Sequence, residues 1–105
     1  MPKAVRFISA WDRSQHFEDH GHEFNPVFAS AEEYESAAVN FLGVPLVGTM
    51  MECLRQDGAI IRYDPTSNEL AICDVDGYVR TYFKPDPAIH KLADNITYFR
   101  RRCSQ

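Results

Sequence analysis

Three of the four histidines in this 105-residue chain lie within seven positions of one another. His16 and His20 are four residues apart, so in a helix they project from the same face. Gly21 predicts the end of that helix, which we expect to run from Arg13 or Ser14 to His20. Histidine titrates near neutral pH, and a ring at a helix C-terminus lies in the field of the backbone dipole. His20 is therefore a candidate proton carrier.

Zinc binding and packing are the two alternatives for these histidines. A zinc site would add Glu23 or His22 to the pair at positions 16 and 20. The glutamate of the His-Glu-x-x-His motif is missing, because position 17 is Phe. We therefore predict no metal and no other cofactor, and packing of the imidazoles in the core stays open as the structural alternative.

The bulk composition is that of one folded domain spanning residues 1–105. Hydrophobic residues make up 45% of the chain and charged residues 25%, which argues against disorder. No apolar run reaches the roughly 18 residues of a membrane span, so no membrane partner is expected. The N-terminus becomes charged too early for a secretory signal. Cys53, Cys73 and Cys103 are an odd number without Cys-x-x-Cys spacing, which predicts free, mostly buried thiols in the reducing cytoplasm.

The formal charge of −4 is unevenly placed. Residues 1–45 carry three basic and seven acidic side chains, whereas residues 46–105 carry eight of each. A generally basic nucleic-acid-binding protein is excluded by this balance. A polyanion would have to meet a local patch, for which the chain offers Arg55, Arg62, Arg80, Lys84 and Arg100–Arg102.

The remaining elements follow from periodicity. Ser30-Ala31-Glu32-Glu33 is a capping box and starts a helix that runs to Phe41 or Leu42 and stops at Gly43. The period then changes from 3.6 to 2, which predicts an antiparallel meander. Its four strands cover about 47–55, 59–63, 69–74 and 78–83, and a short helix follows at about 95–102. The predicted fold class is therefore α+β, with N-terminal helices packed on a four-stranded antiparallel sheet.

The hairpin turn at Asp76-Gly77 predicts which residues share a face of the sheet. Ile72 should lie opposite Thr81 and Cys73 opposite Arg80. One face is apolar and should receive the helices; it collects Ala59, Ile61, Tyr63, Leu70, Ile72, Val79, Thr81 and Phe83. The other face is polar enough for solvent or a ligand and collects Arg62, Ala71, Cys73, Arg80 and Tyr82.

Four phrases in order resemble a known group of proteins over about residues 14–100. They are His16-Phe17-x-x-His20-Gly21-x-Glu23-Phe24, Glu33-Tyr34-x-x-Ala37-Ala38-x-x-Phe41-Leu42, Arg62-Tyr63-Asp64-Pro65-x-x-Asn68-Glu69 and Asp76-Gly77-x-x-Arg80-Thr81-Tyr82-Phe83-Lys84-Pro85. Together they resemble the small bacterial ribonuclease toxin domains of the barnase, EndoU, colicin D and RelE-like superfamily. The resemblance implies helices before a four-stranded sheet, metal-independent cleavage of RNA, with transfer RNA expected, and a cognate immunity or antitoxin protein as partner.

Such cleavage needs a group that takes the proton of the ribose 2′-hydroxyl and groups that stabilise the charge developing on phosphorus. In that light we expect His20 to handle the proton, with His16 as the weaker candidate. Arg62 is expected to bind the scissile phosphate, and Thr81 and Lys84 to stabilise the phosphorane. The expected RNA contacts are Asn68, Arg80 and Tyr82.

The alternative function is a non-catalytic module that keeps the fold and binds RNA or a partner protein. The acidic charge favours it, because many toxins of this superfamily are basic. Delivery into other cells and oligomeric state are left open by the sequence.

Overall fold

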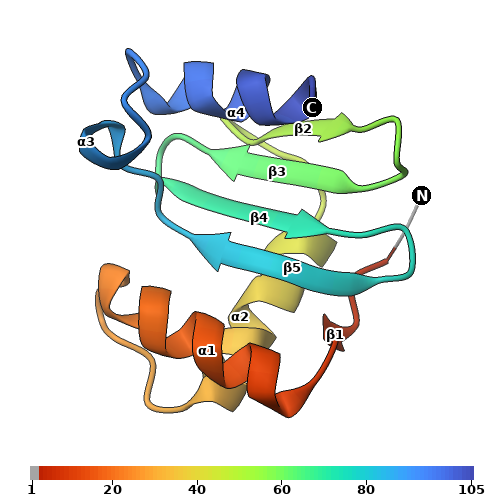
Figure 1. The fold of residues 1–105 in the computed structure, drawn as a ribbon, viewed down its shortest axis with the longest axis vertical. Helices are drawn as coiled ribbons and strands as arrows, with labels where there is room; N and C mark the ends of the chain where they lie inside the picture. Colours follow the sequence, from red (N-terminus) through yellow and green to blue (C-terminus); the bar gives the residue numbers. More distant parts are fainter. Residues whose placement is uncertain (1–2) are drawn as a thin grey trace.

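The computed structural model describes residues 3–105 and forms an α+β fold. Figure 1 shows the chain as a twisted sheet with helices packed around it. The elements in order are β1 (Arg6–Phe7), α1 (Ala10–His20), the 3₁₀ turn η1 (Gly21–Glu23), α2 (Ala31–Gly43), β2 (Met51–Leu54), β3 (Ile60–Asp64), β4 (Glu69–Cys73), β5 (Tyr78–Phe83), α3 (Pro87–His90) and α4 (Asn95–Cys103).

The sheet has the strand order β1-β5-β4-β3-β2. The predicted four-stranded antiparallel meander is present as β2 to β5. Its edge is extended by β1, which pairs in parallel with β5 and was not assigned from the sequence. This short strand leads directly into α1, so it sets where that helix begins beside β5.

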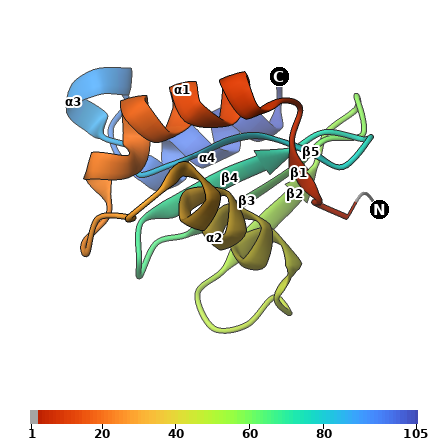
Figure 2. The ribbon, with the colours of Figure 1, turned by 90° about the horizontal axis from the view of Figure 1, so that it is seen from below.

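Both faces of the sheet are covered, which corrects the prediction of one apolar and one solvent-facing side. Figure 2 shows α2 below the sheet and α4 above it. The supposedly polar face packs on α2, with Ala71, Cys73 and Tyr82 all buried there. The opposite face carries Ile61, Leu70 and Ile72 and packs on Phe99 of α4, with the other buried members of this cluster being Ala59 and Tyr63. The face that was predicted to be polar carries small and aromatic residues. Their apolar surface packs against α2 in spite of the polar groups on the same face.

The register between β4 and β5 agrees with the prediction at one pair and differs at the next. Ile72 lies opposite Thr81, as predicted, but Cys73 lies opposite Val79. Arg80 is the extra residue of a β-bulge at this point. The bulge changes the alternation along β5, so Val79 joins the buried cluster beneath α2 instead of the face covered by α4.

Helix α1 begins earlier than predicted because its N-cap is Ser9, whose Oγ accepts from the amide of Asp12 at 3.0 Å. It ends at His20, as predicted. Gly21 has φ of −56°, so no left-handed conformation requires the glycine. The requirement is space, because a Cβ there would lie 2.8 Å from Cδ1 of Phe17.

The predicted N-cap of α2 is confirmed, since Ser30 Oγ accepts from the amide of Glu33 at 3.1 Å. The carboxylate of Glu33 accepts from the amide of Ala29, one residue earlier than a standard capping box. One face of α2 is buried through Tyr34, Ala38 and Phe41. Helix α2 therefore covers the sheet face that was predicted to face solvent or a ligand.

The prediction of three free thiols is wrong. Cys53 of β2 and Cys103 at the end of α4 form a disulfide, and Cys73 is the free, buried cysteine. An odd number of cysteines still allows one disulfide. The two partners are far apart in sequence and meet only because α4 packs across the sheet. Within residues 3–105, no helix is both long and apolar enough to cross a membrane.

Reduction of this disulfide is expected to lower the free energy of unfolding by about 3 to 4 kcal/mol. The bond closes a loop with a sequence separation of 50, and a loop of that length restricts the unfolded chain strongly. Urea unfolding with and without a reducing agent measures the difference. A Cys53→Ser/Cys103→Ser double variant should be insensitive to the reductant; equal sensitivity in both proteins would contradict the assignment.

Candidate active site

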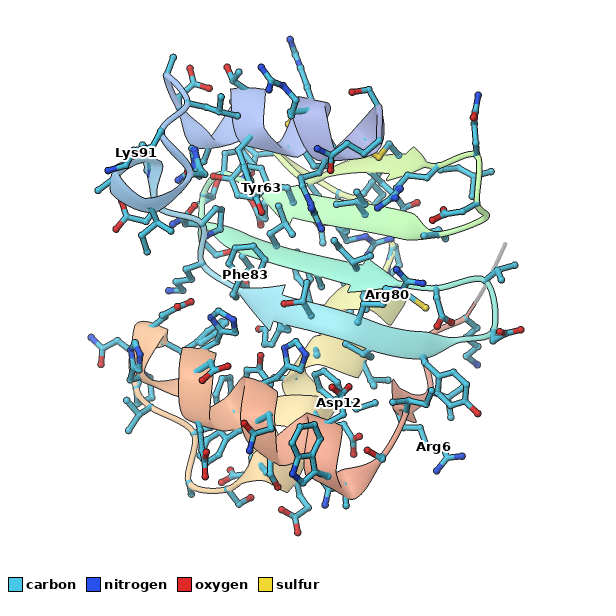
Figure 3. The ribbon with its side chains drawn as sticks, viewed as in Figure 1. Arg6, Asp12, Tyr63, Arg80, Phe83 and Lys91 are labelled. Atoms are coloured by element: carbon cyan, nitrogen blue, oxygen red, sulfur yellow. A yellow bond between two sulfur atoms is a disulfide. The ribbon has the colours of Figure 1, made fainter. Side chains whose placement is uncertain are left out.

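A small cavity of about 100 Å³ lies where the C-terminal ends of α1 and β5 meet α3 and α4. The residues that line it are His20, Glu23, Phe83, Lys84, Asp86, Ile89, His90 and Tyr98. Figure 3 marks Phe83 on β5 between α1 and α4. The imidazole of His20 packs on Phe83 with ring centroids 5.2 Å apart. Two of the predicted catalytic residues, His20 and Lys84, are therefore brought together by the fold.

Glu23 contacts the imidazole of His20 and the backbone of Lys84. One carboxylate oxygen, Oε2, lies 2.9 Å from Nδ1 of His20, and the other, Oε1, accepts from the backbone amide of Lys84 at 2.9 Å. The 3₁₀ turn η1 makes this possible because it follows α1 directly and carries Glu23 three residues beyond His20. Nδ1 of His20 is thus engaged, and Nε2 is the ring nitrogen left for a substrate.

Lys84 follows the last residue of β5, where strand pairing has ended. Its Nζ lies 5.3 Å from the ring centroid of Phe24, a cation–π contact. Lys84 is half-buried and is the lysine among the residues that line the His20 cavity. A cation and an imidazole at one cavity can stabilise charge that develops on a phosphoryl group, against the opposing charge of the Glu23 and Asp86 carboxylates that also line it.

His16 lies one helical turn before His20 and is held mainly by packing. Its ring stacks on Phe7 at 5.3 Å, and its Nε2 lies 3.6 Å from a carboxylate oxygen of Asp12. Its Nδ1 is buried and has no hydrogen-bond partner among residues 3–105. Burial lowers the pKa of His16 below its ordinary value of 6.5, and His20 acts in the same direction, whereas Asp12 and Asp19 oppose the shift.

The lowered pKa of His16 predicts that stability falls as the pH drops below about 6.5. The unfolded chain takes up a proton there while the folded chain resists it, so the unfolded state binds more protons and stability rises with pH. A His16→Gln variant should lose less stability between pH 7.5 and 5.5 in urea unfolding. His22→Gln, at an exposed position, should keep the parent's pH dependence. The same slope in the His16 variant and the parent would contradict the assignment.

Thr81 lies on the same face of β5 as Phe83, two residues earlier, and is half-buried. It does not line the His20 cavity. Arg80 is exposed at the bulge, nearer the start of β5 (Figure 3). These two residues would extend a binding surface along the strand.

The prediction that Arg62 projects from an open sheet face is wrong. Arg62 is only 6% exposed, and its guanidinium donates to the backbone oxygens of Phe41 at 2.9 Å and Val44 at 2.6 Å. Nε and Nη2 both contact the carboxylate of Glu52, at 2.9 and 2.8 Å. Because α2 covers this face, Arg62 binds the C-terminal end of that helix and has no route to a substrate phosphate.

Two predicted RNA contacts are also occupied within the fold. Tyr82 is 2% exposed, and its hydroxyl donates to Glu69, so its ring cannot stack on a base without unpacking the core. Asn68 adopts φ of +58° in the turn before β4, and its amide bonds to Tyr63, Asn95 and the backbone oxygen of Pro85. Both side chains support the sheet and α4.

Sequence reasoning missed the roles of Glu23, Tyr98 and His90. The usable signal was the spacing of three between His20 and Glu23. His90 stacks on Tyr98 at 4.4 Å and uses both ring nitrogens, contacting Asn95 Oδ1 and accepting from the amide of Leu92. In the described part of the chain, no three metal-ligating side chains gather into one group.

The sequence matches no family model and no curated protein.

Proposed function

We propose that the chain is a metal-independent endoribonuclease toxin whose substrate is transfer RNA. Nε2 of His20 takes the proton of a ribose 2′-hydroxyl, and the 2′-oxygen attacks the adjacent phosphorus. The bond from phosphorus to the 5′-oxygen breaks, a 2′,3′-cyclic phosphate remains on one fragment, and the departing 5′-oxygen takes a proton from solvent water. Lys84 stabilises the phosphorane. The supporting observation is the carboxylate of Glu23, which contacts the His20 imidazole and the Lys84 backbone amide beside one cavity.

The proposal includes a cognate immunity or antitoxin protein and a cytoplasmic site of action, because RNA is there. It also includes delivery from another cell. The Cys53–Cys103 disulfide supports delivery, since such bonds persist mainly in proteins that pass through an oxidising compartment.

Incubation with purified transfer RNA in EDTA tests the activity. We expect discrete fragments with 2′,3′-cyclic phosphate and 5′-hydroxyl ends, mapped by sequencing of the cut ends. Cleavage that appears only when a divalent metal is added, or fragments with 5′-phosphate ends, would contradict the mechanism.

A non-catalytic module that binds RNA or a partner protein is the second candidate. The burial of Arg62 favours it, because the His20 cavity then has Lys84 without a guanidinium beside it. Intact transfer RNA after prolonged incubation with excess protein, together with tight binding to a neighbouring gene product, would establish the binding module.

Glu23→Gln should lower kcat for RNA cleavage by roughly 10-fold to 100-fold while KM changes little. The amide lacks the second acceptor oxygen that holds the Lys84 backbone, and misplacement of a catalytic ring is costly in rate. Steady-state kinetics on a defined RNA measure the effect. Glu18→Gln, an exposed change of the same kind on α1, should leave both constants unaltered. Equal kcat in the Glu23 variant and the parent would remove Glu23 from the mechanism.

A further inference from the structure

A larger hollow of about 520 Å³ lies on the opposite side of the sheet from His20. It is walled by the connection between η1 and α2, by α2 itself, and by the adjoining ends of β4 and β5. Figure 2 shows the connection after η1 and the turn between β3 and β4 at the same end of the molecule. The proposed ribonuclease mechanism uses none of this space apart from Lys84 at its border.

The hollow is lined by aromatic rings. Phe24 is 6% exposed and Tyr82 is 2% exposed, and the half-buried Phe28 packs on Phe24 with centroids 5.1 Å apart. The chain's own Lys84 ammonium lies over Phe24. A ring face at the border of this hollow is therefore already used by a cation, as expected for the negative face of a π system.

Hydrogen-bond acceptors surround the rings. Glu33 and Glu69 each use one carboxylate oxygen within the fold, Glu33 for the amide of Ala29 and Glu69 for the hydroxyl of Tyr82. Each carboxylate has a second oxygen with no protein partner in these contacts. Ser67 also lines the hollow, and its buried hydroxyl has no hydrogen-bond partner in the part of the chain that the structure describes. Two carboxylates against one ammonium leave an excess of negative charge.

We propose that this hollow binds an arginine side chain of a basic partner polypeptide. A guanidinium is planar, stacks on aromatic faces, and presents five donors to carboxylate and hydroxyl acceptors. Its positive charge balances the excess of carboxylate. The connection after η1 and helix α2 belong to residues 1–45, which carry seven acidic and three basic side chains. This part of the chain is therefore negatively charged as well. A polypeptide that approaches this side would therefore be basic.

A nucleotide is the competing ligand, since its base could stack on Phe28, the half-buried ring of this hollow. Its phosphate would then lie near Glu33 and Glu69, and like charges at this separation disfavour binding. Charge therefore favours the cationic side chain. The hollow shares Lys84 with the His20 cavity, but binding of the peptide can be measured without any RNA cleavage.

Titration of the full chain with the peptide Gly-Arg-Gly, followed by amide shifts in ¹H–¹⁵N spectra, tests the proposal. We expect shifts at Phe28, Ser67 and Glu69. The matched peptide with citrulline in place of arginine has nearly the same shape without the charge and should bind at least fivefold more weakly. Glu33→Gln and Glu69→Gln should each raise Kd for the arginine peptide at least fivefold. Asp76→Asn, an exposed charge change at the far end of β4, should leave Kd unchanged.

Both carboxylate variants are expected to fold. Glu33 is exposed on α2, and a glutamine at position 69 can still accept the hydrogen bond from the Tyr82 hydroxyl. Equal binding of the arginine and citrulline peptides would overturn the proposal. Shifts of the same amides by guanosine monophosphate without any by the arginine peptide would also overturn it and would identify a nucleotide subsite.

Discussion

His20→Ala is expected to lower kcat/KM for RNA cleavage on the order of 10³-fold, within the range that general acid–base catalysis contributes. The imidazole is the group at the cavity with a ring nitrogen available to the 2′-hydroxyl, since Glu23 holds the other. The fold should persist because His20 is half-buried and its main packing partner is Phe83. Cleavage of transfer RNA in EDTA measures the rate, and thermal unfolding confirms the folded state.

His22→Ala is the matched control for this variant. It removes the same side chain two positions later, where the residue is exposed and does not line the cavity. The control should retain the parent's activity and its toxicity on expression without a partner protein. Full activity in His20→Ala would eliminate the proposed mechanism, whereas inactivity of the parent itself would favour the binding module.

Arg62→Met is expected to lower the free energy of unfolding by about 3 kcal/mol or more, the cost of breaking a buried ion pair. The change leaves the carboxylate of Glu52 without its cation and removes the donors that bind the backbone oxygens of Phe41 and Val44. For a domain of this size, Tm should fall by roughly 10 °C or more. Urea and thermal unfolding measure both quantities.

Arg100→Met provides the comparison, because this arginine is exposed on α4 and its loss should change stability by about 0.5 kcal/mol or less. A Glu52→Leu change added to Arg62→Met should restore part of the lost stability by removing the unpaired carboxylate. Below its Tm, the Arg62 variant should cleave RNA at the parent's rate per folded molecule. A variant with unchanged Tm and no cleavage would return Arg62 to the catalytic site.

The sequence determined helices, strands and turns wherever they depend on contacts between residues that are close in the chain. Ser30 and Glu33 start α2 through contacts within one turn, and Asp76-Gly77 closes the hairpin because Gly77 adopts φ of +93°. Hydrophobic periodicity placed β3, β4 and β5 because alternation is a property of each strand alone. These features depend on contacts that are short in sequence.

Tertiary contacts decided the rest. Whether Arg62 faces solvent or a helix depends on where α2 lies, and the helix C-terminus that it binds is 18 to 21 residues away in sequence. Cys53 and Cys103 pair across 50 residues, and Glu23 reaches the amide of Lys84 across 61. The sequence by itself determined that His20 ends a helix beside a glycine. Only the packing of α1 against β5 decided which nitrogen of His20 is available and which cation lies beside it, because those contacts form when the chain closes on itself.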